Sequence, residues 1–232
     1  MMEHIDHAGV LVDFGTWIGY TVLFGAQIAR RTYGLEADPA AFAAVRTNLL
    51  LNAGSAWSER VHLQASGVGV KSELASMYSV HPGNSCSGFG NKTAGCWGPY
   101  PASSWTVQVY SLAFLFQHWS VPESPMTFVK VDVEGLECSL VPSWLPWLRG
   151  METKPTFLIA FHSDIVRCTD EQYAAVAELV HLYGHVREIR KSLVVLDRRG
   201  RFTGGKAEVL FTDRLVLDLR KENRTADVHF GG

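Results

Sequence analysis

The sequence predicts an α/β fold in which a mostly parallel β-sheet is covered by helices. Short runs rich in β-branched and aromatic residues alternate with helical segments along the 232 residues. The last two strand-like runs are joined by the turn-rich segment RRGRFTGGK, which predicts an antiparallel hairpin at the carboxyl end of the chain. These observations favour one sheet whose other strands are connected through helices.

Seven segments are enriched in the aliphatic, β-branched and aromatic residues that strands prefer. Most are bounded by glycine, aspartate or other turn-forming residues, which mark the ends of strands. The predicted strands are Val10–Phe14, Tyr33–Ala37, Val61–Ala65, Phe128–Asp132, Thr156–Phe161, Leu193–Asp197 and Ala207–Phe211.

Helices are predicted between these strands from the spacing of apolar positions and from capping residues. Asp38 and Pro39 open one helix, because proline is favoured in a first helical turn. Thr169 is a suitable cap for another helix, which Gly184 ends. The other predicted helices lie at about Ile18–Arg30 and Ser111–Trp119, and the helix capped by Thr169 spans Glu171–Tyr183.

Length and composition suit a single domain over residues 1–232. Residues 80–104 are dominated by glycine, serine, asparagine and proline, which predicts a long loop inserted after the third strand. The formal charge is −2 and no concentrated basic stripe is present. We therefore expect no nucleic-acid partner.

Residues 10–29 are apolar enough to suggest a membrane span, but Asp13, Gln27 and several glycines within them argue against insertion. The first residues, MMEHIDHAG, are unlike the basic start of a signal peptide. The cysteines form no CxxC pair, so we expect reduced thiols in a cytoplasmic protein. In an oxidising compartment, the pair that flanks the glycine-rich loop is the candidate disulfide. The four cysteines are Cys86, Cys96, Cys138 and Cys168.

The segment VLVDFGTWIGYTVLFG, residues 10–25, places a turn between a strand and a helix, where parallel sheets bind ligands. Gly15 and Gly19 allow the backbone to approach a ligand closely, and the helix start offers free amides. Their spacing is not the GxGxxG of a pyrophosphate site, and Asp13 would repel a diphosphate. These features favour S-adenosylmethionine, which carries a sulfonium, an ammonium and one carboxylate, over a nicotinamide dinucleotide.

Two other strand ends carry candidate cofactor-binding residues. Glu36 ends the second predicted strand, where an acidic side chain can accept hydrogen bonds from both hydroxyls of a ribose. Ser66 follows the third strand, where small residues leave room for an adenine.

The fourth predicted strand ends in FVKVDVEGLE, which gathers one cation and several carboxylates. Asp132 and Glu134 share one side if the strand persists that far. Such carboxylates can deprotonate a hydroxyl, hold its donor group or ligate a metal, and the sequence leaves these roles open. We expect Lys130 to orient them through an ion pair. His162, after the fifth strand, is a second candidate base.

Three segments together resemble the FkbM-type methyltransferases, which are class I, Rossmann-like S-adenosylmethionine enzymes. They are VDFGTWIGYTVLFG, GLEADPAAFAAVRTNLLLN and FVKVDVEGLE, in the family's order and spacing, and the resemblance covers roughly residues 10–165. The most specific element is KVDVEGLE, which is close to the family's K-I-D-x-E-G-x-E signature. The resemblance implies a doubly wound, mostly parallel seven-stranded sheet, with which the C-terminal antiparallel hairpin agrees.

The resemblance also implies S-adenosyl-L-methionine as the cofactor and O-methylation of a hydroxyl on a small molecule or sugar. The segment with Asn84, Ser85 and Ser87 falls where family members often carry a serine before the acidic signature. From the methionine end to the adenine, the implied cofactor-binding residues are Asp13, Gly15, Gly19, Glu36 and Ser66. The candidate catalytic residues are Asp132, Glu134 and His162, and no metal ligand is assigned.

The sequence also departs from the family pattern. Thr16 and Trp17 replace the usual Ala-Asn between the two glycines, and Ala160 stands where a glutamate is often found. About ten residues precede the first motif, where most members carry a substantial segment. These departures motivate a second hypothesis, a catalytically inactive methyltransferase-like binding module. A third, an NAD-dependent oxidoreductase, is disfavoured by Asp13 and by the GxxxG spacing.

Overall fold

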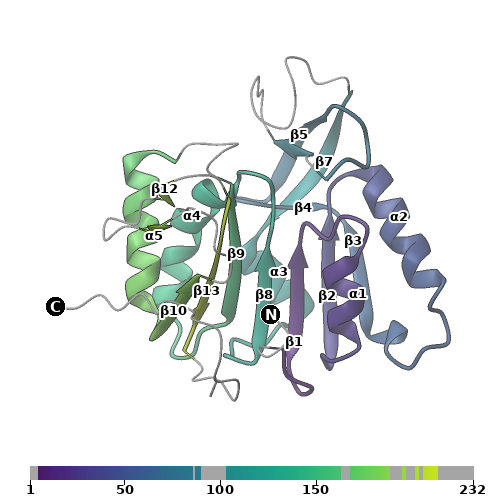
Figure 1. Ribbon diagram of the computed structural model, residues 1–232, viewed down its shortest axis with the longest axis horizontal. Coiled ribbons are helices and arrows are strands. Elements are labelled where there is room, and N and C mark those ends of the chain that lie inside the picture. Colours follow the sequence, from purple (N-terminus) through teal and green to yellow (C-terminus); the bar gives the residue numbers. More distant parts are fainter. Residues whose placement is uncertain are drawn as a thin grey trace.

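A seven-stranded β-sheet runs through the centre of the molecule in the computed structural model (Figure 1). The structure describes residues 5–85, 87–89, 103–162, 168–188, 195–196, 202–203 and 206–213. The strand order is β10-β13-β9-β8-β1-β2-β3. These strands are β1 (Val10–Phe14), β2 (Arg31–Glu36), β3 (Val61–Ala65), β8 (Thr127–Val131), β9 (Thr156–His162), β10 (His185–Glu188) and β13 (Lys206–Thr212).

Five neighbouring strands of this sheet, from β9 to β3, are parallel. β13 runs antiparallel to β9 on one side and to β10 on the other. The predicted mostly parallel seven-stranded sheet with an antiparallel end is therefore confirmed. Two predicted strands, Val10–Phe14 and Val61–Ala65, have the observed bounds.

The predicted C-terminal hairpin is correct only in part. Within the predicted strand Leu193–Asp197, the described residues form β11 (Val195–Leu196), which pairs with β12 (Phe202–Thr203) in a separate two-stranded sheet. The antiparallel neighbour of β13 at the edge of the main sheet is β10 instead. The sequence of β10, HVRE, carries charged residues, as edge strands often do, and this hid it among the helix and loop segments.

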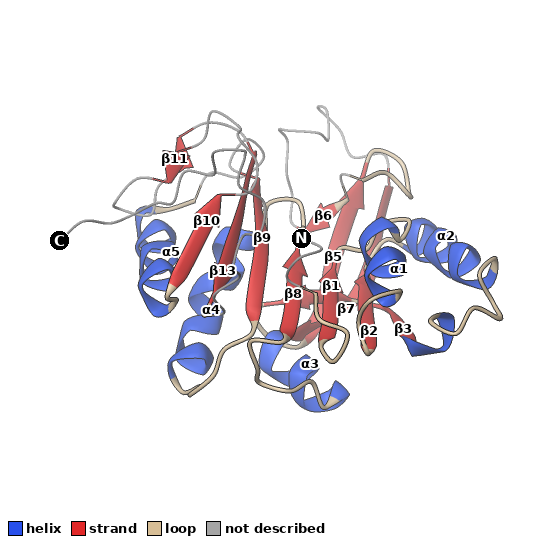
Figure 2. Cartoon of the chain, turned by 60° about the horizontal axis from the view of Figure 1, so that its bottom comes forward, coloured by secondary structure: helices blue, strands red, loops and turns tan. Residues whose placement is uncertain are grey.

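Helices cover both faces of the sheet, as Figures 1 and 2 show. On one face, Val12 and Phe14 of β1 pack with buried residues of three helices. On the other face, Val22 of the first helix and Val45 of the second pack with Val61 of β3. The helices are α1 (Tyr20–Ala26), α2 (Pro39–Leu50), α3 (Leu112–Trp119), α4 (Glu137–Arg149) and α5 (Asp170–Leu182), and a short 3₁₀ helix, η2, spans Ser58–Arg60.

A second, four-stranded sheet lies above the carboxyl ends of the main strands in Figure 1. Its order is β4-β7-β5-β6, and it occupies the chain between β3 and α3. The predicted loop 80–104 is thus incorrect for residues 88–89 and 103–104, which are strand, while residues 86 and 90–102 lie outside the described residues. The strands are β4 (Gly67–Gly69), β5 (Glu73–Ser79), β6 (Gly88–Phe89) and β7 (Ser103–Ser111).

A disulfide joins Cys138, in the first turn of α4, to Cys168, just before α5. The expectation of reduced thiols is therefore wrong for this pair. The two cysteines are 30 residues apart and meet because α4 and α5 pack side by side, which no local spacing reveals. Since disulfides are typical of oxidising compartments, the cytoplasmic location stays a prediction that this pair does not support. Within the described ranges, no helix has both the length and the apolar character that a bilayer span requires.

Candidate functional site

An open cavity lies at the carboxyl ends of β1, β2 and β8, and its space of about 510 Å³ includes the part that is open to solvent. Residues of the second sheet also line it. Its polar lining residues come from three strand ends and from the segment after β5. The lining residues are Gly15, Trp17, Leu35, Glu36, Ala37, Ser66, Gly67, Val68, Met77, Asn84, Ser85, Ser87, Phe89, Asp132, Val133 and Glu134.

The structure brings most of the predicted site residues to this cavity. Those that line it are Gly15, Glu36, Ser66, Asp132 and Glu134. The other three predicted residues, Asp13, Gly19 and His162, lie outside the lining set. Gly19 adopts a left-handed conformation (φ 101°) at the start of α1, where a β-carbon would collide with Val45 and Leu23. It packs the helix against its neighbours rather than facing the cavity.

Gly15 forms the turn that follows β1. Its φ angle is 79°, which side chains disfavour, and a β-carbon at this position would overlap the carbonyl oxygen of Asp132. The backbones of the β1 and β8 ends are therefore in direct contact here. Any side chain at position 15 would displace the residue that begins the acidic segment.

Glu36 is buried at the end of β2, and its carboxylate accepts two backbone N–H groups. Trp17 N donates to one oxygen at 2.7 Å and Asp38 N to the other at 2.8 Å. Burial raises the pKa of Glu36, although these hydrogen bonds oppose the rise. A carboxylate offers about four acceptor positions, so both oxygens keep capacity for further donors in the cavity.

Asp13 and Lys130 form an ion pair beside the cavity. They are register partners on adjacent strands and face the same side of the sheet. Lys130 Nζ lies 3.1 Å from Asp13 Oδ1 and 3.5 Å from Asp132 Oδ2, and the Asp13 side chain has no solvent exposure. Burial by itself lowers the pKa of Lys130, but the two carboxylates outweigh it and raise that pKa. The ion pair predicted for Lys130 is thus present, and Asp13 is its nearer partner.

The strand β8 ends at Val131, so Asp132 and Glu134 belong to a loop and not to a continued strand. Glu134 has a positive φ of 52° and Gly135 a φ of 99°. The carboxylate of Glu137 holds this turn by accepting Val133 N at 3.1 Å and Gly135 N at 3.0 Å. A left-handed residue other than glycine is uncommon, and such strain tends to occur at functional sites.

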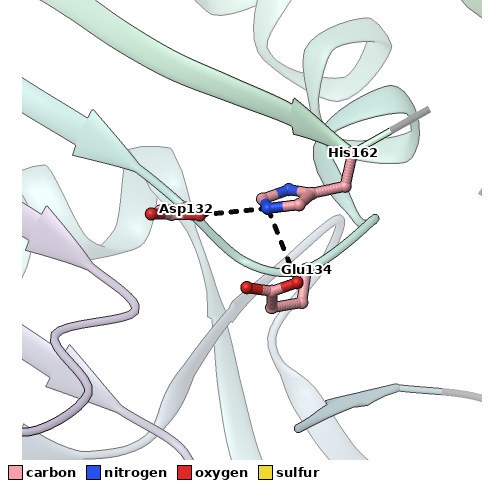
Figure 3. A group of neighbouring side chains, drawn as sticks. All are labelled: Asp132, Glu134 and His162. Atoms are coloured by element: carbon pink, nitrogen blue, oxygen red, sulfur yellow. Dashed lines mark ion pairs between the residues drawn. The ribbon is translucent and has the colours of Figure 1, made fainter. Parts of the chain in front are cut away.

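His162, the last residue of β9, points toward the two acidic side chains of this loop (Figure 3). Its Nε2 lies 3.4 Å from Asp132 Oδ1 and 3.5 Å from Glu134 Oε2, while Nδ1 lies 2.9 Å from Glu137 Oε1. Burial by itself lowers the pKa of His162, but the hydrogen bond to Glu137 and the three carboxylate charges outweigh it and raise that pKa. The structure therefore groups all three predicted catalytic residues.

The sequence interpretation missed the residue that ties the second sheet to the site. Asp38 caps α2 through Oδ1, which accepts Ala40 N, and its Oδ2 accepts Gly83 N at 2.8 Å and Ser87 Oγ at 2.7 Å. Trp17 Nε1 also donates to the Gly83 carbonyl at 3.0 Å. The Asp38-Pro39 pair signals a helix cap, but no local pattern indicates the second role.

Comparison with known proteins gives matches to solved structures, whereas no protein-family model and no curated protein matches the sequence. The chain is similar to methyltransferase FkbM from Methylobacillus flagellatus KT, with a TM-score of 0.52 and 13% identity over 89% of this chain. It spans only 44% of that protein's chain.

Two other similar structures have lower scores. An rRNA methylase from Streptococcus thermophilus gives a TM-score of 0.45 at 12% identity, over 92% of each chain. TrmK of M. capricolum, solved with S-adenosyl-homocysteine, gives 0.43 at 9% identity, over 94% of this chain and 68% of that one. At such identities the FkbM match establishes the fold alone, which is that of the class I methyltransferases. The resemblance carried by the sequence motifs is confirmed at this level.

Proposed function

We propose that the chain is an S-adenosylmethionine-dependent methyltransferase that methylates a hydroxyl group of a small molecule or sugar. The observation that carries this proposal is the single cavity shared by Glu36, at one strand end, and by Asp132 and Glu134, at another. One part of the cavity suits a nucleoside, and the other suits a hydroxyl that must lose a proton. The fold is compatible with this activity but does not by itself assign it.

The residues present fit the cofactor. Glu36 keeps acceptor capacity for ribose hydroxyls, and Ser66, at the end of β3, leaves space for an adenine. At Gly15 the backbone itself lines the cavity, so the methionine part can approach closely. Asp13 stays a predicted contributor at this end, and its partner Lys130 also contacts the Gly15 carbonyl at 3.4 Å. When bound, S-adenosylmethionine supplies an electrophilic methyl group.

The acidic loop would position the acceptor and take its proton. Methyl transfer needs the acceptor oxygen in line with the methyl group, and positioning alone contributes much of the rate. A hydroxyl holds its proton at neutral pH, so a nearby base is worth about 10²–10⁴-fold. Asp132 or Glu134 would accept this proton. His162, whose Nε2 faces both carboxylates, would then stabilise the carboxyl group that holds the proton.

Radiolabelled methyl transfer to a panel of sugars, phenols and small alcohols tests this proposal. We expect one acceptor class to be methylated, and we expect Asp132→Asn to lower turnover by about 10²–10⁴-fold while sparing cofactor binding. RNA belongs in the panel as well, because the absence of a nucleic-acid partner is still a prediction. Methylation of RNA alone, or equal turnover by the Asp132→Asn protein, would contradict the proposal.

The inactive binding module remains the second candidate, because one observation favours it. Trp17 lines the cavity, and its indole is fixed by the hydrogen bond to Gly83, so a bulky ring occupies space where the family usually has asparagine. Cofactor binding without transfer to any acceptor would support this module. A Trp17→Asn variant that gains transfer would identify the ring as the reason.

A further inference from the structure

We infer that Asp132, Glu134 and His162 form a binding site for a divalent transition-metal ion, with Glu137 as the carboxylate that orients the histidine. One ligand atom from each of the three residues lies within 4.8 Å of the others, and no other such group of three occurs among the described residues. Figure 3 shows the three side chains converging.

The first argument is the state of the histidine. His162 is only 4% exposed, and its Nε2 has no hydrogen-bond partner although it is buried. An unmet buried nitrogen is costly, so such atoms are rare in folded proteins. This nitrogen points at two carboxylates, and a cation between the three groups would satisfy it.

The second argument is the distances. A charge-assisted hydrogen bond from a protonated imidazole to a carboxylate is about 2.7–2.9 Å long. The observed separations of 3.4 Å to Asp132 and 3.5 Å to Glu134 are too long for that. For a zinc-type ion about 2.1 Å from each ligand atom, tetrahedral geometry separates two ligand atoms by about 3.4 Å. The separations from Nε2 match this value.

The third argument is the partner on the other side of the ring. Histidines that bind metals nearly always donate their second N–H to a carboxylate or carbonyl, which fixes the ring and its tautomer. Glu137 Oε1 lies 2.9 Å from His162 Nδ1, and the Glu137 side chain is only 1% exposed. Because two backbone N–H groups donate to the same carboxylate, it acts as an acceptor, and Nδ1 carries the proton. Nε2 is then the nitrogen with a free lone pair.

The donor set indicates the kind of ion. One imidazole and two carboxylates suit zinc, manganese or iron better than calcium, which prefers oxygen ligands alone. Asp132 and Glu134 line the cavity, whereas His162 lies outside the lining, on the far side of these two residues. Three protein ligands therefore leave a coordination position open toward the cavity, as in catalytic metal sites.

An acceptor hydroxyl could occupy that open position, a role that rests on the proposed function. Metal ions acidify bound water and hydroxyl groups strongly. The cation would then promote proton loss from the acceptor, and the proton would pass to the carboxylate oxygen of Asp132 or Glu134 that does not ligate the ion. Metal binding itself requires neither cofactor nor acceptor.

The test is titration of the purified, chelator-treated protein with ZnSO₄ by calorimetry, without S-adenosylmethionine. We expect one saturable site per chain. His162→Ala and Glu134→Gln should remove saturable binding, and Glu137→Gln should weaken it by about 10–100-fold. Glu73→Gln is the matched control, because Glu73 is an exposed carboxylate paired with Lys71 outside the site. Circular dichroism verifies that each variant is folded. If His162→Ala does not fold, the conservative Glu134→Gln variant still tests the site.

Titration with CoCl₂ identifies the ligands by a second readout. Nitrogen and oxygen ligands in tetrahedral geometry should give strong visible d–d bands that the Glu134→Gln protein lacks. A sulfur-to-cobalt charge-transfer band would assign the ion to cysteines and overturn the inference. An absence of zinc binding would also overturn the inference, as would equal binding by the parent, His162→Ala and Glu134→Gln proteins. The three side chains would then form only a network of ion pairs. A separate titration of the metal-free protein with S-adenosylmethionine distinguishes failure of the metal site from failure of the proposed function.

Discussion

Asp132 lies between two groups of charged side chains that differ in geometry. On one side, Lys130 pairs with the buried carboxylate of Asp13 at 3.1 Å. On the other side, the carboxylates of Asp132, Glu134 and Glu137 converge on His162, and two of these contacts are long. The first group is a short buried ion pair that suits a structural role. The second is an arrangement that a cation-binding or proton-transfer site requires.

The largest expected effect comes from breaking the ion pair between Asp13 and Lys130. Lys130→Met leaves the Asp13 carboxylate buried without a countercharge, so the free energy of unfolding should fall by about 3–5 kcal/mol. Urea denaturation followed by circular dichroism measures the loss. Lys71→Met is the control, because Lys71 pairs with Glu73 on the surface and such pairs contribute less than about 1 kcal/mol.

A double variant, Asp13→Asn/Lys130→Met, sharpens this result. Removing both charges avoids the unpaired carboxylate, so the double variant should be more stable than Lys130→Met alone. If Lys130→Met unfolds like the parent protein, the pair has no structural role and the contrast between the two groups fails.

The next effect concerns the disulfide beside the carboxylate group, where Cys138 directly follows Glu137. Reduction should lower the free energy of unfolding by about 3–4 kcal/mol for a loop of this length. Denaturation curves recorded with and without reducing agent measure the difference. The Cys138→Ser/Cys168→Ser protein should be less stable than the parent and insensitive to the reductant. If the reductant does not change the free energy of unfolding of the parent protein, the disulfide contributes nothing to stability.

A smaller loss of stability is expected from Glu137→Gln. The amide offers one acceptor oxygen in place of two, so Val133 N, Gly135 N and His162 Nδ1 cannot all keep their partner. Leaving one buried donor unsatisfied costs about 1–3 kcal/mol, which thermal unfolding detects. An unchanged melting temperature would mean that this carboxylate does not hold the turn.

The smallest effect is a pH dependence at Glu36, away from both groups. Since burial raises its pKa, Glu36 takes up a proton at a higher pH than an exposed glutamate does. Protonation removes acceptor capacity for ribose hydroxyls, so affinity for S-adenosylmethionine should fall as pH drops through the raised pKa. The folded state binds this proton more readily than the unfolded state, so the same acidification favours folding at this group. Calorimetry across pH should give a flatter profile for Glu36→Gln, and identical profiles would contradict the assignment.

The sequence predicts the parallel core of the molecule well because its signals are local. β1 and β3 have the expected bounds, and the residues at the ends of β1, β2 and β8 meet as parallel topology requires. The residues that close the site depend on contacts distant in sequence. No local pattern reveals that Asp38 binds Gly83, or that Cys138 meets Cys168.

The second sheet and the acidic turn were hidden for different reasons. β5 and β7 are separated by 23 residues, and the sequence between them is rich in glycine and serine, which indicates a loop. Asp132 and Glu134 were expected on one face of a strand, but the strand ends before them. The left-handed turn at Glu134, held by Glu137, brings them together instead.

The most direct test of the central claim is a calorimetric titration of the purified protein with S-adenosylmethionine, alongside NADH and the Gly15→Val variant. We expect saturable binding of S-adenosylmethionine, no binding of NADH, and no binding of either by Gly15→Val, whose side chain would displace Asp132. Binding of NADH alone, or of S-adenosylmethionine equally by the variant, would contradict the assignment of this cavity.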